Sequence, residues 1–111
     1  MFNIALLGAG RIGQVHAANI ASHGATTLWS VVDPNQEFAT RLAAQYQARQ
    51  QSLNEAMTDP NVHAVLIASA TDTHADLIEM AARHGKAIFC EKPVHLDLAR
   101  VRDCQIGRAH V

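Results

Sequence analysis

The stretch Gly8-Ala9-Gly10-Arg11-Ile12-Gly13 decides the fold that we expect for this chain, because its glycines follow the pattern G-x-G-x-x-G. A short apolar run, Asn3–Gly8, leads into these glycines, and apolar residues at helical spacing follow them over Arg11–Ser22. A glycine-rich turn that joins a buried strand to a helix is typical of a dinucleotide-binding domain. The alternative is an ordinary strand–helix turn with one packing glycine, which the flanking strand and helix make the less favoured interpretation.

Each glycine of this turn has a predicted task. Gly8 allows a tight turn, Gly10 has no Cβ atom to keep a pyrophosphate away from the backbone, and Gly13 lets the helix pack close to the strand. The helix begins at Arg11 and Ile12, where free backbone N–H groups and the positive end of the helix dipole attract phosphate. We therefore expect Gly8, Gly10, Arg11, Ile12 and Gly13 to bind the cofactor.

Strand-like and helix-like segments alternate along the chain. Further strands are predicted at Thr27–Val32, Ala64–Ala68 and Ala87–Cys90, and further helices at Glu37–Gln47, Leu53–Thr58, Thr73–His84 and Leu96–Cys104. A short strand near Arg49–Gln51 is indicated only by weak periodicity. Strands separated by helices of about ten residues indicate βαβ units, so the expected fold class is α/β, with a Rossmann-type doubly wound parallel sheet.

An acidic residue follows the glycine turn at the distance that a ribose site requires. Asp33 lies twenty residues after Gly13, at the end of the second predicted strand, where its carboxylate can accept both ribose hydroxyls of an adenosine. Asp33 is also a candidate N-cap with Pro34 at the first helical position, and the two roles can coexist. Neither Pro34 nor Asn35 offers a cation for a 2′-phosphate, so NAD is favoured over NADP.

The carboxyl end of the strand Ala64–Ala68 supplies further candidates, because ligands of open parallel sheets bind at such ends. Ser69, Thr71 and Thr73 can line a dinucleotide with hydroxyl and backbone groups. Helix capping is an equally good role for the two threonines, since Thr73 with Asp76 resembles a capping box. His74 completes this part of the expected cofactor site, and we interpret it as a surface or helix-start histidine rather than a catalytic base.

The tripeptide Glu91-Lys92-Pro93 directly follows the last predicted strand. A lysine at the carboxyl end of such a strand points into the ligand crevice, and the following proline holds Lys92 in extended backbone. The alternative is a solvated pair of Glu91 and Lys92 that ends a strand. The glycine turn upstream favours the binding role, so both residues are included in the expected cofactor site.

Composition limits the function classes that remain. The chain has 111 residues, of which 49% are hydrophobic and 5% aromatic, and its formal net charge is −1. These values fit one globular domain, and they argue against a nucleic-acid or membrane partner. No apolar run approaches about 20 residues, the N-terminus lacks signal-peptide features, and Cys90 and Cys104 lack metal-ligand spacing. We expect a cytoplasmic protein with reduced thiols and no metal site.

These segments together resemble the Gfo/Idh/MocA family of NAD(P)-dependent oxidoreductases. The resemblance is carried by the segments Ile4–Gly13, Ala68–His74 and Gly85–Val94. It runs from Phe2 to about Gln105, and the combined order of G-x-G-x-x-G, T-x-T-H and E-K-P is specific for the family. Within the family, the run from Glu91 to Leu98 is most similar to that of bacterial inositol 2-dehydrogenases.

The resemblance implies oxidation of a CH–OH group of a polyol or sugar, with transfer of the hydride to NAD. It also implies that Lys92 is catalytic and assists the loss of the hydroxyl proton, since the positive charge of oxidised nicotinamide lowers the pKa of a nearby lysine. Family members carry a second domain that holds the substrate and the oligomer interface, so a homo-oligomer is expected of the full-length protein. Another substrate within the family, or a non-enzymatic NAD-sensing module, is the alternative.

The last residues of the chain depart from the family pattern. We expect a nucleotide-binding domain over residues 1–105 that is incomplete at its C-terminal end and lacks the substrate domain. The hexapeptide 106–111 is what the DNA string ATCGGAAGAGCACACGTC encodes, and this string matches a common sequencing-library adapter. We therefore interpret these six residues as adapter read-through. A genuine helix end with Gly107 at the C′ position is the alternative.

Overall fold

The computed structural model describes residues 2–69 and 74–90 of the chain. The expectations for Thr71, Thr73, Glu91, Lys92, the helix at 96–104 and residues 106–111 lie outside the described residues. The elements, in chain order, are β1 (Phe2–Leu7), α1 (Arg11–Ser22), β2 (Thr26–Val32), α2 (Gln36–Gln45), β3 (Arg49–Gln50), α3 (Leu53–Thr58), β4 (Ala64–Ile67), α4 (His74–Arg83) and β5 (Ala87–Cys90).

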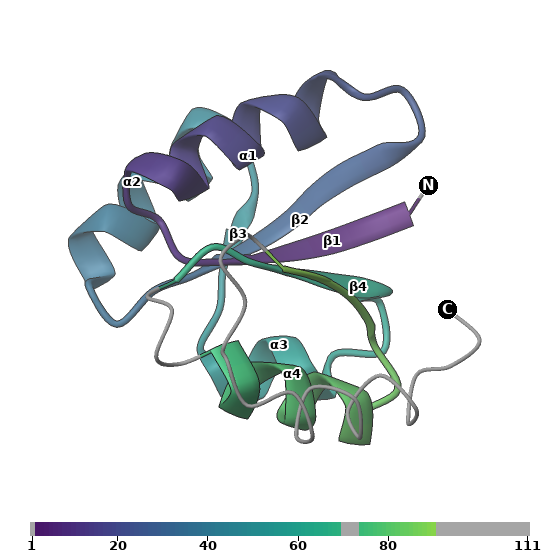
Figure 1. Cartoon of the computed structure of the whole chain (residues 1–111). Coiled ribbons are helices and arrows are strands. Elements are labelled where there is room, and N and C mark those ends of the chain that lie inside the picture. The colour runs from purple at the N-terminus through teal and green to yellow at the C-terminus, as the bar shows by residue number, and fades with distance from the viewer. Residues whose placement is uncertain (1, 70–73, 91–111) are drawn as a thin grey trace.

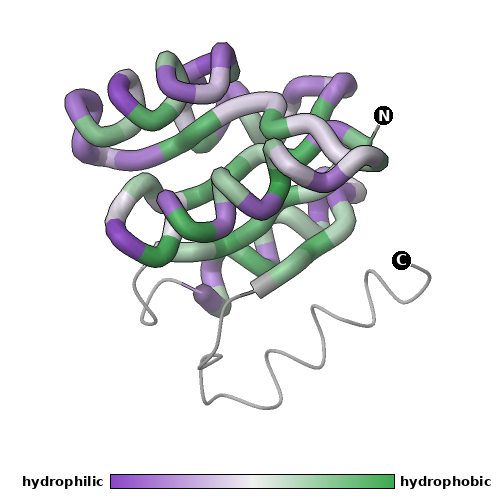
Figure 2. Tube along the Cα trace, turned by 90° about the horizontal axis from the view of Figure 1, so that it is seen from above, coloured by the Kyte–Doolittle hydropathy of each residue, from purple (hydrophilic) through white to green (hydrophobic). Residues whose placement is uncertain are grey.

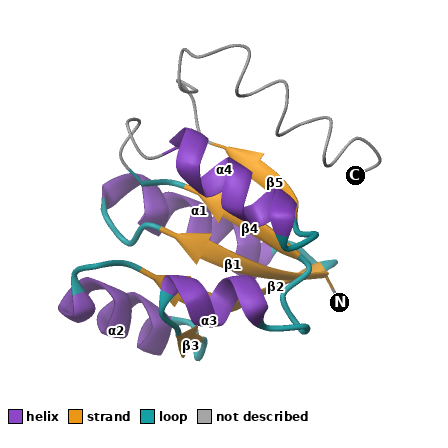
Figure 3. Cartoon of the chain, turned by 90° about the horizontal axis from the view of Figure 1, so that it is seen from below, coloured by secondary structure: helices purple, strands orange, loops and turns teal. Residues whose placement is uncertain are grey.

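The strands form one five-stranded sheet in the order β3-β2-β1-β4-β5 (Figure 3). All four neighbouring pairs are parallel, which confirms the α/β class and the Rossmann-type, doubly wound sheet. The chain builds outward from β1 through β2 to β3 and then returns to place β4 on the other side of β1. The direction of winding therefore reverses between β1 and β4, and ligands of such sheets bind at the carboxyl ends beside this reversal.

The sheet lies between two layers of helices, with α1 and α2 on one face and α3 and α4 on the other (Figure 1). The core under α1 and α2 includes Ile4, Leu6, Ala17, Ile20, Leu28, Leu42 and Ala64. The core under α3 and α4 includes Ala5, Leu7, Met57, Val65, Ile67 and Ile78. Because both faces are covered, β4 and the part of β1 from Ile4 to Leu7 are uninterrupted apolar runs, and Figure 2 shows green, hydrophobic stretches inside the molecule.

The boundaries of the described elements agree with the predicted ones to within one residue, except at the end of α2. This helix ends at Gln45, two residues before the predicted end at Gln47. Gln47 has a φ of +56°, so the chain leaves the helix in the left-handed conformation. The N–H of Gln47 donates to the carbonyl of Ala44 over 3.3 Å, and the N–H of Ala48 to that of Ala43 over 2.8 Å. This is a Schellman motif, which usually has glycine where this chain has glutamine.

None of the helices within residues 2–69 and 74–90 is long and apolar enough to span a lipid bilayer.

Candidate functional site

The turn after β1 is shaped by close contact with the backbones of β2 and β4. Gly8 has a φ of +117°, a conformation that residues with a side chain rarely adopt. Its N–H donates to the carbonyl oxygen of Val32 over 2.8 Å. A Cβ atom on Gly8 would lie 2.8 Å from the carbonyl carbon and oxygen of Ala68. The fold itself therefore requires glycine here, as expected of a tight turn.

The other two glycines of the turn lie in opposite environments. A Cβ atom on Gly13 would lie 2.0 Å from the carbonyl oxygen of Gly8, so only glycine allows α1 to start this close to the strand. A Cβ atom on Gly10 would meet nothing within 4 Å. The described fold thus gives no steric reason for glycine at position 10, and the space above the backbone there is open.

That open space lies at the N-terminus of α1. Gly10 is the N-cap and provides no side-chain acceptor, and the first turn of the helix contains no acidic residue. The first hydrogen bond of the helix runs from the N–H of Gln14 to the carbonyl oxygen of Gly10, over 2.9 Å. The N–H groups of Arg11, Ile12 and Gly13 come before this first intrahelical bond, and such groups can bind an anion together with the helix dipole.

Asp33, at the carboxyl end of β2, is bonded to the glycine turn. Its Oδ2 accepts the N–H of Ala9 over 2.7 Å, and its Oδ1 accepts the N–H of Asn35 over 2.8 Å. The N-cap of α2 is Asn35, whose side chain accepts the N–H of Phe38 over 3.1 Å. The alternative role considered for Asp33, an N-cap with Pro34 in the first helical position, is therefore wrong. The chain runs on two residues before the helix starts, which leaves the carboxylate at the turn.

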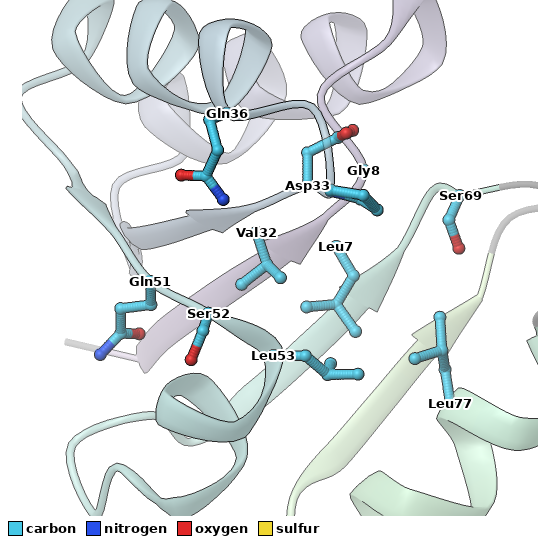
Figure 4. A pocket seen from close by; sticks show the side chains of 11 residues that line it. Leu7, Gly8, Val32, Asp33, Gln36, Gln51, Ser52, Leu53, Ser69 and Leu77 are labelled. Carbon is cyan, nitrogen blue, oxygen red and sulfur yellow. The ribbon is translucent and has the colours of Figure 1, made fainter.

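A pocket of about 410 Å³ opens beside Asp33 at the carboxyl ends of β1, β2 and β4 (Figure 4). It is lined by Leu7, Gly8, Val32, Asp33, Pro34, Gln36, Gln51, Ser52, Leu53, Ser69 and Leu77. Most of this surface is apolar, and the size falls in the range of small-molecule sites. Leu53 of α3 and Leu77 of α4 line it from the side of the helices, with the Asp33 carboxylate near the glycine turn (Figure 4).

Ser69 and His74 have different positions relative to this pocket. Ser69 lines it, whereas His74, the first residue of α4, does not. Of the two positions expected for His74, the helix start is confirmed, whereas a surface position is wrong, because the residue is only 2% exposed. Its Nε2 lies 2.9 Å from the carbonyl oxygen of Ser69, so the ring links the start of α4 to the segment that follows β4.

The structure brings Gly8, Asp33 and Ser69 together around one pocket, with Gly10 and the start of α1 next to it. Sequence analysis did not assign the other pocket-lining residues to the site: Leu7, Val32, Pro34, Gln36, Gln51, Ser52, Leu53 and Leu77. Gln51 and Ser52 could have been found from the sequence, because they directly follow β3. Ligands of open parallel sheets bind at the carboxyl ends of strands, and this holds for β3 as it does for β1, β2 and β4. Among residues 2–69 and 74–90, no group of three potential metal ligands comes together.

Comparison with known proteins agrees with this geometry. The model of the Gfo/Idh/MocA oxidoreductase family, with an NAD-binding Rossmann fold, matches residues 2–106. Inositol 2-dehydrogenase of Rhizobium meliloti (strain 1021) is 46% identical over 99 residues, which cover 89% of this chain and 30% of that protein. The scyllo-inositol 2-dehydrogenase (NAD(+)) of Bacillus subtilis (strain 168) is 40% identical over 97 residues, 85% of this chain and 28% of that protein.

A crystal structure of a myo-inositol dehydrogenase from Corynebacterium glutamicum ATCC 13032 superposes with a TM-score of 0.85 at 41% identity, covering 98% of this chain and 33% of that one. The chain thus spans about a third of the length of the relatives that it matches. Within that third, the family match includes the glycine turn, Asp33 and all the strands of the sheet. The chain belongs to the Gfo/Idh/MocA family of oxidoreductases and forms its NAD-binding Rossmann fold.

Proposed function

We propose that this chain is the cofactor-binding part of an NAD-dependent dehydrogenase that oxidises a CH–OH group of a polyol, with myo-inositol as the substrate. The observation that carries the proposal is the contrast between the glycines of the turn. The fold itself excludes a Cβ atom at Gly8 and at Gly13, whereas the space at Gly10 is open within 4 Å. An open backbone next to the N-terminus of a helix without a side-chain cap suits a pyrophosphate.

The neighbouring residues suit the adenosine end of the same cofactor. The Asp33 carboxylate already accepts two backbone N–H groups, and an ionised carboxylate has about four acceptor positions in all, so it retains capacity for ribose hydroxyls. The adenine ring would enter the apolar pocket next to Asp33. Ser69, on the opposite side of the pocket, would contribute polar groups to the cofactor, as would Thr71 and Thr73, which follow it in the chain. His74 would support this contact by holding the carbonyl group of Ser69.

The chemistry at the other end of the cofactor involves Glu91 and Lys92, which follow β5. Bound NAD supplies the acceptor for the hydride. We assign to Lys92 the removal of the hydroxyl proton from the substrate, and to Glu91 a contact with the cofactor. The support for these roles is the E-K-P pattern at the carboxyl end of a strand, together with relatives whose names specify an inositol 2-dehydrogenase.

The test of this proposal is the oxidation of myo-inositol by the full-length protein that contains this chain. We expect NADH formation with myo-inositol, and we expect Lys92→Met to lower turnover by roughly 10²-fold, the usual effect of losing an acid–base group. The affinity for NAD should change far less, because the residues that hold the pyrophosphate and ribose are elsewhere. Full turnover in the Lys92→Met protein would contradict the role of the lysine, and absence of NADH formation with any inositol would contradict the substrate.

A further inference from the structure

One wall of the pocket comes from a single short segment of the chain. Gln51, Ser52 and Leu53 are consecutive, and all three line the pocket (Figure 4). They join β3 to α3, and Leu53 is the first residue of that helix. An isolated helix of six residues is not stable in water, so α3 and the wall at its start depend on contacts with the rest of the fold.

Asp59 ties the two ends of α3 together. It is the C-cap of the helix, and Gln51 lies just before the N-cap, Ser52. Nε2 of Gln51 donates to Oδ2 of Asp59 over 3.0 Å. Nε1 of Trp29 donates to the same oxygen over 3.0 Å, and the N–H of Asn61 donates to Oδ1 over 2.8 Å. The carboxylate therefore links the start of the wall to β2 and to the segment that precedes β4.

The charge of Asp59 has the wrong sign for the end of a helix. A helix C-terminus carries the negative end of the dipole, which a nearby carboxylate destabilises. The hydrogen bonds from the Asn61 backbone, Trp29 and Gln51 outweigh this effect and lower the pKa of Asp59 to about 2. An ionised carboxylate has about four acceptor positions, so it takes all three donors at once, which one amide or hydroxyl oxygen does not. Asp59 thus serves to gather donors rather than to cap α3.

Asp59 also lies close to a buried lysine, which gives it a structural role of a different kind. Lys86 is 6% exposed, and its Nζ donates to the carbonyl oxygens of Asp59 and Val62 over 2.6 and 2.8 Å. Burial lowers the pKa of Lys86, whereas the charge of Asp59 raises it. Removal of the carboxylate would therefore cost stability whether or not it acts on the pocket. Ligand affinity, measured beside stability, distinguishes the two roles.

We propose that Asp59 is a positioning residue of the pocket, which acts through Gln51 and holds the segment from Gln51 to Leu53 in place before a nucleotide binds. The inference rests on the proposed function, because it takes the pocket to hold the adenosine part of NAD. Asp59 does not line the pocket itself. A wall that is already formed costs the ligand no ordering, so loss of the Gln51–Asp59 hydrogen bond should weaken binding without removing a contact to the ligand.

Calorimetric titration of ADP into the parent chain and its variants tests the proposal, with urea denaturation to show that each variant is folded. In Asp59→Ser the side chain is too short to reach Gln51, but it can still accept the N–H of Asn61. We expect the ADP affinity to fall about fivefold, which corresponds to about 1 kcal/mol, the usual net contribution of one hydrogen bond. Gln51→Met breaks the same hydrogen bond from the other side and should have a similar effect.

The double variant shows whether Asp59 acts through Gln51. In the Gln51→Met background, Asp59→Ser should change the ADP affinity by less than about a factor of two, because the bond through which it acts is already gone. Trp29→Phe is the matched control, since it removes another donor from the same oxygen of Asp59 and leaves Gln51 bonded. It should lose stability but keep the ADP affinity of the parent to within about a factor of two.

A folded Asp59→Ser chain that binds ADP as tightly as the parent would overturn the proposal. An equal loss of affinity in both backgrounds would also overturn it, because Asp59 would then act by a route other than Gln51. If Asp59→Ser does not fold, Gln51→Met decides, since a parent-like ADP affinity contradicts any role of this hydrogen bond. If ADP does not bind to the parent chain, the proposed function itself fails, and the inference fails with it. Binding that is insensitive to these substitutions is the failure of the inference alone.

Discussion

At the scale of single residues, the three glycines of the turn separate what the fold needs from what a ligand needs. Gly8 and Gly13 face backbone atoms at distances that no Cβ atom tolerates, whereas Gly10 faces open space. The motif alone predicted a task for each glycine, and the structure confirms the two structural tasks. The task of Gly10 stays a prediction, because it concerns a group that approaches from outside the chain.

Gly13→Ala should destabilise the fold even without any ligand. The added methyl group would lie 2.0 Å from the carbonyl oxygen of Gly8, so α1 must shift away from the turn. We expect a loss of at least about 2 kcal/mol in the free energy of unfolding, measured by urea denaturation. Gly10→Ala is the control and should cost about 1 kcal/mol or less, the usual effect of exchanging an N-cap residue. Equal stability of the two variants would contradict the distinction between these glycines.

Asp33→Ser should shift the cofactor preference of the full-length protein toward NADP. The substitution removes a negative charge that would repel a 2′-phosphate, and it removes an acceptor for the ribose hydroxyls. We expect the ratio of kcat/KM for NAD to that for NADP to fall by roughly tenfold or more. Glu37→Ser is the matched control, because Glu37 is an exposed carboxylate of α2 that does not line the pocket. If the ratio stays constant in Asp33→Ser, Asp33 serves only to bond the glycine turn.

At the scale of elements, the sequence predicts the type of every described helix and strand, and among their boundaries only the end of α2 differs by more than one residue. Gly85, with a φ of +74°, follows α4 and marks its end in the sequence. Gln47 has the same role after α2 without being a glycine, so the pattern predicted a longer helix. Ser52 and Glu55 form a capping box that the spacing S-x-x-E could have indicated.

Gln47→Gly should stabilise the chain, because glycine adopts the left-handed conformation without the steric cost that a Cβ atom imposes. We expect a gain of about 1 kcal/mol in the free energy of unfolding. Ala44→Gly provides the opposite control, since Ala44 is exposed and belongs to the last turn of α2, where glycine costs up to about 1 kcal/mol relative to alanine. Thermal unfolding of both variants tests this, and a loss of stability in Gln47→Gly would show that the Schellman motif is not what ends the helix.

At the scale of the whole molecule, the alternation of strands and helices was enough to predict a doubly wound parallel sheet. Local patterns could not show which residues from distant segments meet. The pocket wall joins Gln36 after β2, Gln51 after β3 and Leu77 in α4, and these residues have neither a shared motif nor a fixed spacing. Their proximity follows from the strand order, which places the ends of β1, β2 and β4 side by side. The glycine turn and Asp33 were predictable because they belong to one βαβ unit.

The most direct test of the central claim, that this fold binds NAD at the glycine turn, is a calorimetric titration of NAD into the parent chain and into Gly10→Val. The valine side chain would occupy the open space over the backbone at the start of α1, where the pyrophosphate is expected. Urea denaturation of both chains should show that each is folded. The account predicts that the parent binds NAD and that Gly10→Val binds it at least about tenfold more weakly. Equal affinity of two folded chains would contradict it.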